Sequence, residues 1–196
     1  MKVSREKEDF REEIITQAQA LFRQYGLKKT TMDEIAAATG KAKATLYHYF
    51  RSKEEVFEAM LDREMKHLRK SVKEKVDAQK GVFKKVETYL NEFFKGIFER
   101  ANLYRLVSSD VLNGQKSKAY FKEFFTFEKR YFKRLLEDGL DAGELKSIPR
   151  EEMDWFAEMF LTGFFGIMKH SIEYDTQLTP DHFKKAIDRF VKKILE

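Results

Sequence analysis

The sequence predicts an all-α fold of about nine helices: a three-helix unit containing a helix-turn-helix, a long connecting helix, and a larger helical part. Apolar residues recur at helical spacing along most of the chain. Two capping-box patterns stand in front of expected helices, and the 196 residues include only two prolines. The chain has no Pro/Ser-rich linker, so we expect the long helix itself to connect the two parts.

Four helices are expected in the first eighty residues. They are predicted over residues 10–25, 32–39, 43–50 and 53–80. Gly26 and Gly40 follow the first two as stop signals. Thr31-Met32-Asp33-Glu34 and Ser52-Lys53-Glu54-Glu55 have the capping-box pattern that begins a helix. These boundaries predict a first domain over residues 1–52 and a connecting helix over 53–80.

The remaining residues, 81–196, are expected to form a second helical domain. Helices are predicted over residues 82–100, 103–112 and 120–142, followed by one of roughly twenty residues from Pro149 and one of roughly fifteen from Pro180. Proline is favoured in the first turn of a helix, where its missing N–H costs nothing.

Several function classes are disfavoured by composition. The absence of cysteine excludes disulfides, cysteine-ligated metals and a thiol nucleophile. The four histidines have no metal-ligand spacing, and no glycine-rich phosphate loop is present, so we predict no metal, no cofactor and no enzyme activity. The longest uncharged apolar stretch, Met159–Met168, is half of what a membrane span needs, and the N-terminus lacks a signal-peptide pattern. We therefore expect a cytoplasmic protein with no membrane partner.

Basic residues are concentrated between Arg23 and Lys53, where seven of them stand against two acidic residues. A local basic excess of this kind is typical of a site for a polyanion such as DNA. The stretch Lys66–Lys85 is equally basic, and we assign it to solvated surface. Charge alone therefore does not decide between a binding face and a solvated one.

The two short helices fit a helix-turn-helix. In such a motif the second helix buries one face and presents the other to the major groove of DNA. Leu46 and Phe50 are the expected inner residues. The expected outer residues are Lys43, Ala44, Thr45, Tyr47 and His48.

Residues 14–61 resemble the N-terminal domain of the TetR-type (TetR/AcrR-like) transcriptional repressors. The resemblance is carried by Ile14-Ile15, Ala18, Leu21-Phe22, Gly26, Thr30-Thr31, Ile35-Ala36, Gly40 and the run Thr45-Leu46-Tyr47-His48-Tyr49-Phe50-Arg51-Ser52-Lys53-Glu54-Glu55. It implies that Lys43, Thr45, Tyr47 and His48 face the groove, and that Thr31, Tyr49 and Lys53 contact the phosphate backbone. Tyr49 could equally be a packing aromatic.

The resemblance has two departures. The family usually has Val-Ser after the turn glycine, where this chain has Lys41-Ala42. Alanine cannot cap the second helix with a side-chain hydrogen bond, at a cost of about 1 kcal/mol. Lys41 must point toward solvent or phosphate instead of packing in the turn.

Aromatic residues are enriched after Gly81, which is followed by fifteen of the nineteen phenylalanines. Large rings in a helical bundle readily leave an apolar cavity, and the resemblance implies an effector pocket there. The candidate lining residues are Tyr89, Phe93, Tyr104, Phe124, Glu128, Tyr131, Phe164 and His170. His170 fits a core or interface position better than a ligand contact.

The helix from Pro149 is apolar on nearly all sides, which predicts burial both within the subunit and against a second copy. The last helix has a single apolar stripe, and together the two resemble the family's four-helix dimer interface. The expected interface residues are Trp155, Phe156, Phe160, Gly163, Phe164, Ile167, Phe183, Ile187 and Phe190.

These observations favour a homodimeric, ligand-responsive regulator, a repressor that binds a palindromic operator in double-stranded DNA on the nucleoid. A small apolar or aromatic effector would release it. The alternative is a TetR-like DNA-binding protein that is controlled by a protein partner instead of a small molecule.

Overall fold

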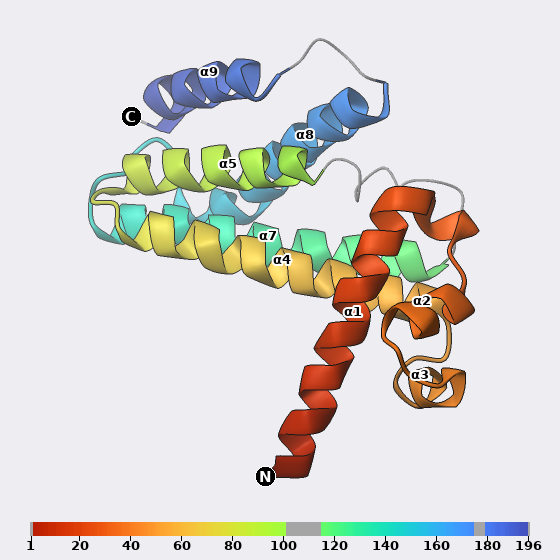
Figure 1. Ribbon diagram of the computed structural model, residues 1–196. Helices are drawn as coiled ribbons and strands as arrows, with labels where there is room; N and C mark the ends of the chain where they lie inside the picture. The colour runs from red at the N-terminus through yellow and green to blue at the C-terminus, as the bar shows by residue number, and fades with distance from the viewer. Residues whose placement is uncertain (1, 101–114, 175–178, 196) are drawn as a thin grey trace. The chain divides into compact units, whose positions relative to one another are not determined.

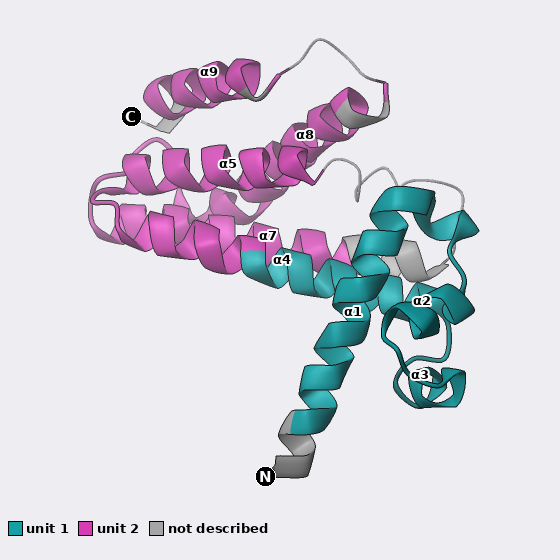
Figure 2. Ribbon diagram, in the orientation of Figure 1, with its two compact units in different colours: residues 1–67, 106–111 teal, residues 68–105, 112–196 magenta. Residues whose placement is uncertain are grey.

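The computed structural model describes residues 2–100, 115–174 and 179–195, and these residues form eight α-helices and no strand (Figure 1). They divide into two compact units, which are coloured separately in Figure 2. The border lies inside one helix, between His67 and Leu68. The all-helical prediction is therefore confirmed.

The first unit contains the short helices. Its elements are α1 (Lys2–Lys29), α2 (Met32–Ala38), α3 (Lys43–Tyr49) and the first part of α4 (Lys53–Asp77). Gly26 has a φ of 79°, a conformation that favours glycine, and this interrupts α1 where the sequence predicted its end. Helix α1 continues for one more turn beyond it.

Helices α2 and α3 differ in how their first turns are capped. The Thr31 hydroxyl accepts from the Glu34 N–H at 3.2 Å, and the Glu34 carboxylate accepts from the Thr31 N–H at 2.8 Å, which confirms the capping box. Helix α3 begins after Ala42, whose side chain makes no capping hydrogen bond, as the sequence predicted.

The first part of α4 belongs to the core of the first unit. Val56, Phe57 and Met60 are fully buried, and the Phe57 ring meets the edge of Phe22 from α1 at 5.5 Å between centroids. This burial explains why the compact unit extends to His67 and not only to residue 52, where the sequence placed the end of the first domain.

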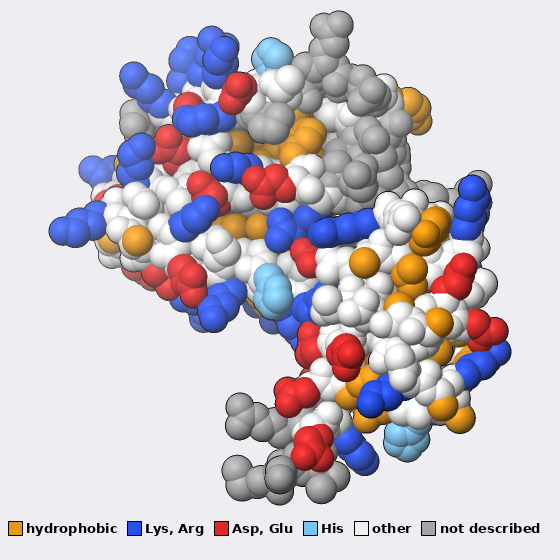
Figure 3. Space-filling model, viewed as in Figure 1, with side chains coloured by type: hydrophobic (Ala, Val, Ile, Leu, Met, Phe, Trp, Pro, Cys, Tyr) orange, Lys and Arg blue, Asp and Glu red, His pale blue; other side chains and the backbone are white. Residues whose placement is uncertain are grey.

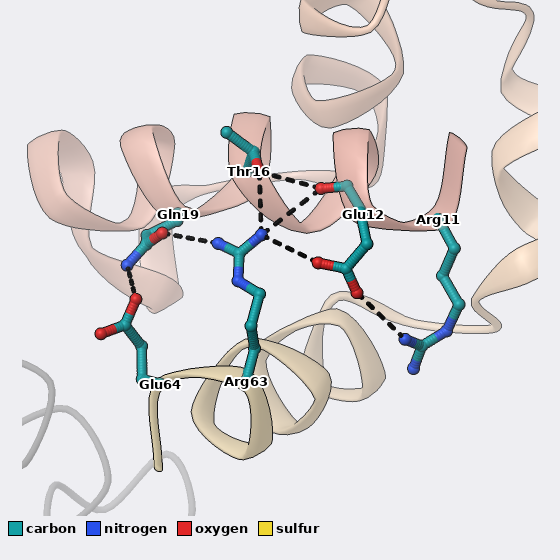
Figure 4. Close-up of polar contacts among 6 residues, drawn as sticks. All are labelled: Arg11, Glu12, Thr16, Gln19, Arg63 and Glu64. Carbon is teal, nitrogen blue, oxygen red and sulfur yellow. Dashed lines mark hydrogen bonds and ion pairs between the residues drawn. The ribbon is translucent and has the colours of Figure 1, made fainter. Parts of the chain in front are cut away.

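A polar cluster joins α4 to α1 beside this core (Figure 4). The Arg63 guanidinium donates to the Thr16 hydroxyl at 2.8 Å and to the Gln19 side-chain carbonyl at 2.7 Å. It also lies 3.4 Å from the Glu12 carboxylate. The Gln19 side-chain NH₂ group donates to Glu64 at 2.8 Å, so Arg63 contacts three residues of α1 directly and Glu64 through Gln19.

The second unit contains the other part of α4 and the helices that follow. These are α5 (Val82–Glu99), α7 (Gln115–Asp141), α8 (Met153–Glu173) and α9 (Pro180–Phe190), with a 3-10 turn at Arg150–Glu152 and a π turn at Val191–Leu195. Helix α7 begins five residues before the predicted start, and the 3-10 turn separates Pro149 from α8. Pro180 is the first residue of α9, as predicted. The predicted helix over residues 103–112 lies outside the described residues.

Aromatic rings fill the core of the second unit. Phe94 of α5 meets Phe164 of α8 at 3.5 Å and Phe183 of α9 at 4.4 Å between centroids. Helix α5 also approaches α4 closely at Gly96, where a Cβ would collide with Leu68. Among the helices described, none is long and apolar enough to cross a membrane, and no group of His, Asp and Glu within them could hold a metal ion.

We expect the substitution Arg63→Met to lower the free energy of unfolding by about 2 kcal/mol, because it removes hydrogen bonds from a charged donor that is mostly buried. Urea denaturation followed by circular dichroism would measure this change. Lys66→Met is the matched control, since Lys66 is an exposed residue on the same helix. Equal midpoints for the two variants would contradict this role of Arg63.

Candidate functional site

Helix α3 buries one face and exposes the other. Leu46 is completely buried and Phe50, at its C-terminal cap, is 4% exposed. Four predicted contact residues are exposed on the opposite side: Ala44, Thr45, Tyr47 and His48. The two apolar residues therefore anchor α3 in the core of the first unit. The hydroxyl, aromatic and imidazole groups on its other side are exposed at the surface, where they can contact a ligand.

Lys43, the first residue of α3, is exposed but paired. Its ammonium lies 2.6 Å from the Asp33 carboxylate of α2 and 6.0 Å from the centroid of the Tyr47 ring. The hydrogen bond to Asp33 raises the pKa of Lys43, so the side chain stays charged at neutral pH. An exposed pair of this kind contributes little stability and is easily exchanged for another anion.

Two of the predicted backbone contacts already have structural roles. Tyr49 is half-buried, and its ring meets the edge of Phe10 at 5.2 Å, which agrees with its interpretation as a packing aromatic. The Thr31 hydroxyl takes part in the capping box of α2, and it remains exposed.

Lys53 has a different role from the one that the resemblance implied. Its ammonium donates to the carbonyls of Leu27, Lys28 and Thr30 at 2.8, 3.0 and 2.9 Å. Three bonds use every N–H of the ammonium, and they satisfy carbonyls at the C-terminal end of α1. Lys53 therefore joins the start of α4 to the end of α1, and its ammonium has no N–H left for the phosphate contact that the resemblance implied.

The second unit contains a cavity of about 540 Å³ between α4, α5 and α7. This volume lies in the range of small-molecule sites. Its lining comprises Arg69, Lys70, Val72, Lys73, Val76 and Asp77 of α4, Lys85, Tyr89 and Phe93 of α5, and Phe127, Glu128, Tyr131, Arg134, Leu135 and Asp138 of α7.

A carboxylate of α7 lies at the centre of the cavity wall. Glu128 is 1% exposed, and its two oxygens accept from Arg69 Nε at 2.7 Å and from the Tyr89 hydroxyl at 2.9 Å. Burial raises the pKa of Glu128, while the Arg69 guanidinium and the Tyr89 hydroxyl act in the opposite direction. Burial and the neighbouring Glu128 also raise the pKa of Tyr89 well above its ordinary value.

Aromatic rings continue the wall on both sides of Glu128. The Arg69 guanidinium lies 4.0 Å from the centroid of Phe127 and 5.3 Å from that of Phe124. The Tyr131 ring lies 5.1 Å from Tyr89. Burial and three nearby carboxylates raise the pKa of Tyr131 to about 12, so its hydroxyl stays protonated.

Helix α8 presents a second unusual surface. Trp155, Met159 and Ile167 are 51%, 60% and 52% exposed, which is high for large apolar side chains. They share one face with Gly163 and Gly166, where a Cβ would meet nothing within 4 Å. This face is therefore apolar, open and close to the helix backbone.

The interior side of α8 faces α9. Phe160 stacks on Phe190 at 4.1 Å, and a hollow of about 220 Å³ lies beside them. Phe156, Phe183 and Ile187 are 9%, 6% and 2% exposed, so they are buried inside the subunit. These three predicted interface residues therefore offer a partner little surface, and Phe183 and Ile187 offer theirs only in the lining of the hollow.

Comparison with known proteins agrees with this geometry. Residues 14–60, which include α2 and α3, match the family model described as bacterial regulatory proteins, tetR family. The chain is 28% identical over 185 residues to the uncharacterized HTH-type transcriptional regulator YfiR of Bacillus subtilis, and the match covers 90% of this chain and 87% of that protein. Residues 14–60 therefore form a DNA-binding domain of the TetR family of transcriptional regulators.

Two further matches are also transcriptional regulators. A segment of 51 residues, 26% of this chain and 25% of the relative, is 41% identical to the HTH-type transcriptional repressor KstR2 of Mycolicibacterium smegmatis. A transcriptional regulator from Cytophaga hutchinsonii has the same fold, with a TM-score of 0.75 and 25% identity over 94% of this chain and 98% of that one. These relatives are transcriptional regulators, which confirms the prediction that this chain is not an enzyme.

The structure divides the residues that were predicted to line an effector pocket. Tyr89, Phe93, Glu128 and Tyr131 line the cavity. Phe124 is not a lining residue, but its ring centroid lies 5.3 Å from the guanidinium of Arg69, which is one. Two further candidates are corrected: Phe164 lines the hollow between α8 and α9, and His170 is exposed on α8, where its ring lies 4.7 Å from Tyr174. Tyr104 lies outside the described residues.

The sequence analysis missed the basic side of the cavity. Four lining residues, Arg69, Lys70, Lys73 and Lys85, fall in the stretch Lys66–Lys85, which the sequence assigns to solvated surface, and Arg134 and Phe127 are not among the predicted pocket residues. One signal was available: Arg69 lies next to Leu68 and three residues before Val72, in line with the buried stripe of α4.

We expect Glu128 to give the stability of this protein a distinct pH dependence. Because burial raises its folded-state pKa, the folded protein keeps the proton to higher pH than the unfolded chain does. The free energy of unfolding of the wild type, relative to that of Glu128→Gln, should therefore fall as pH rises from the ordinary carboxyl range through the folded pKa.

Urea denaturation of both proteins between about pH 4.5 and 7 would measure this difference. Glu123→Gln is the control, since Glu123 is exposed on the same helix, and its difference from the wild type should not follow this trend. The burial argument would be contradicted if the free energy of unfolding of the wild type, relative to that of Glu128→Gln, stayed constant or rose with pH.

Proposed function

We propose that this TetR-family regulator is a homodimeric repressor that binds a palindromic operator and is released by a small molecule. One observation supports the DNA-binding part above all: α3 is anchored by Leu46 and Phe50, while Thr45, Tyr47 and His48 are exposed together on its outer side. Side chains of these types donate to phosphates and base edges. Such a regulator would act in the cytoplasm, on the nucleoid.

The proposed contact set follows the structure. Ala44, Thr45, Tyr47 and His48 face the major groove, because they lie on the exposed side of α3. Lys43 exchanges Asp33 for a DNA phosphate, a change that costs little for an exposed ion pair. Thr31 and Tyr49 lie at the edge of this surface and keep their structural roles.

A second copy of the chain is the proposed partner of α8. TetR-family regulators dimerise, and a two-fold axis would place two recognition helices in successive major grooves. The exposed face with Trp155, Met159 and Ile167 supplies apolar area, and Gly163 and Gly166 permit a close helix-helix approach. Phe160, Phe164 and Phe190 are half-buried and border this region.

The cavity favours control by a small molecule over control by a protein partner, since its lining is concave and belongs to one compact unit. Helix α4 contributes Arg69, Val72 and Val76 to the cavity and Lys53 and Phe57 to the first unit. A ligand that changes the preferred position of α4 would alter operator affinity by a coupling of about 1–3 kcal/mol.

We expect Tyr47→Ala to weaken binding to the promoter DNA of the protein's own gene by about tenfold or more, because it removes a large exposed group from the groove face. Fluorescence anisotropy would measure the affinity. The wild-type affinity should also fall steeply as salt increases, since phosphate contacts release counterions.

Tyr25→Ala is the matched control, because Tyr25 is similarly exposed but lies on α1. A flat salt response of the wild type, or equal losses in the two tyrosine variants, would refute the assignment of α3 as the recognition helix.

We expect the wild type to sediment as a dimer at micromolar concentration and Met159→Glu to sediment as a monomer, because a carboxylate would be buried against an apolar partner face. Trp155 is the only tryptophan and lies on this face, so its emission should shift to the red when the dimer dissociates. Tyr25→Glu should leave the dimer intact. A monomeric wild type would exclude the proposed interface.

A further inference from the structure

The orientation of Arg69 is fixed on two sides. Its Nε donates to the buried Glu128 carboxylate, and its guanidinium plane lies against the rings of Phe127 and Phe124. Within the described residues, the two terminal NH₂ groups of this guanidinium make no hydrogen bond. Arginine has five N–H donors, so four of them remain open at the cavity wall. A planar pair of open donors with a fixed orientation suits a carboxylate ligand.

Glu128 offers no comparable site for a cation. Both of its oxygens already accept hydrogen bonds, one from Arg69 and one from Tyr89, and the side chain is 1% exposed. Its charge is balanced by Arg69 at 2.7 Å. The pair therefore presents the cavity with unused donors and with no unused carboxylate.

The rest of the lining has a cationic excess. The Lys73–Asp77 ion pair balances itself, as the Arg69–Glu128 pair does. Lys70, Lys85 and Arg134 remain, against Asp138 as the one further carboxylate of the lining, and none of these four is ion-paired within the part of the chain that the structure describes. Figure 3 shows basic side chains along the α4 and α5 side of this unit, with acidic ones among them.

The remaining surface of the cavity is apolar. Its apolar lining residues are Val72 and Val76 of α4, Phe93 of α5 and Leu135 of α7, and the Tyr131 ring adds to this surface. A ligand that fills about 540 Å³ must therefore have an apolar body as well as a charged group.

We infer that the cavity binds an amphiphilic organic anion, whose carboxylate pairs with the open N–H groups of Arg69 and whose apolar body lies against Val72, Val76 and Phe93. This inference rests on the proposed function, in that it names the chemical class of the effector of the same cavity. It adds a charged group to the small apolar or aromatic effector that the sequence predicted.

The first test compares three probes that share a decyl chain and differ in charge: decanoate, decan-1-ol and decyltrimethylammonium. Isothermal titration calorimetry on the full chain should show decanoate binding at least about tenfold more tightly than the other two, since only decanoate can pair with Arg69. Equal or tighter binding of the alcohol or the cation would overturn the inference, as would no binding of any probe.

The second test uses variants that keep the buried charges balanced. Arg69→Met combined with Glu128→Gln removes both members of the pair, so no carboxylate is left buried alone. We expect the decanoate affinity of this double variant to be at least about tenfold lower than that of the wild type. This is the same factor that should separate decanoate from decan-1-ol in the first test. Glu128→Gln alone keeps Arg69 and should bind decanoate as well as the wild type or better.

Lys84→Ala is the control, because Lys84 lies on α5 in an exposed pair with Glu87, outside the cavity lining. Circular dichroism verifies that each variant is folded. Unchanged decanoate affinity in the folded double variant would overturn the role of Arg69, and so would a tenfold loss in Glu128→Gln alone.

Adding decanoate to the protein-DNA complex separates the two proposals. Release of the promoter DNA by decanoate supports both. A protein that binds decanoate through Arg69 and still holds its DNA contradicts the proposed ligand control, and leaves the anion site supported. A protein that binds no DNA at all refutes the proposed function without changing the calorimetric result.

Discussion

The burial of one carboxylate, Glu128, is the constraint on which the second unit depends. A carboxylate that is 1% exposed is costly unless charged or hydrogen-bonding partners compensate it. Here the partners come from two other helices, Arg69 from α4 and Tyr89 from α5. A single side chain of α7 therefore fixes the relative register of three helices, and these are the same helices that form the cavity.

The first unit uses the same principle with cations in place of a carboxylate. Lys53 supplies three donors to the carbonyls that end α1, and Arg63 connects the middle of α1 to α4. Both residues lie on α4, and so does Arg69 in the second unit. Charged groups therefore secure this helix in each unit. Apolar packing such as that of Phe22 on Phe57 provides the area, and the charged groups determine which turn of one helix meets which turn of the next.

The helix-turn-helix could be predicted from the sequence because its signals are local. A capping box at Thr31, a glycine at position 40 and the alternation of Leu46 and Tyr47 between two faces are all decided within a few residues. The role of Lys53 could not be found in this way, because its acceptors lie 23 to 26 residues earlier in the chain. The cavity required contacts over still longer separations, such as the 59 residues between Arg69 and Glu128.

This difference in sequence separation also explains why a basic stretch can be assigned incorrectly. The basic residues at positions 66, 69, 70 and 73 look alike in the sequence. They differ in the face of α4 that each one occupies. Lys66 is exposed with no partner among the described residues, whereas Arg69 reaches a buried carboxylate on another helix. Net charge is positive both in the stretch of the proposed DNA-binding face and in the stretch that lines the cavity, so it does not distinguish a binding surface from a solvated one. Only the position of each side chain on its helix separates solvated lysines from the arginine that a ligand could use.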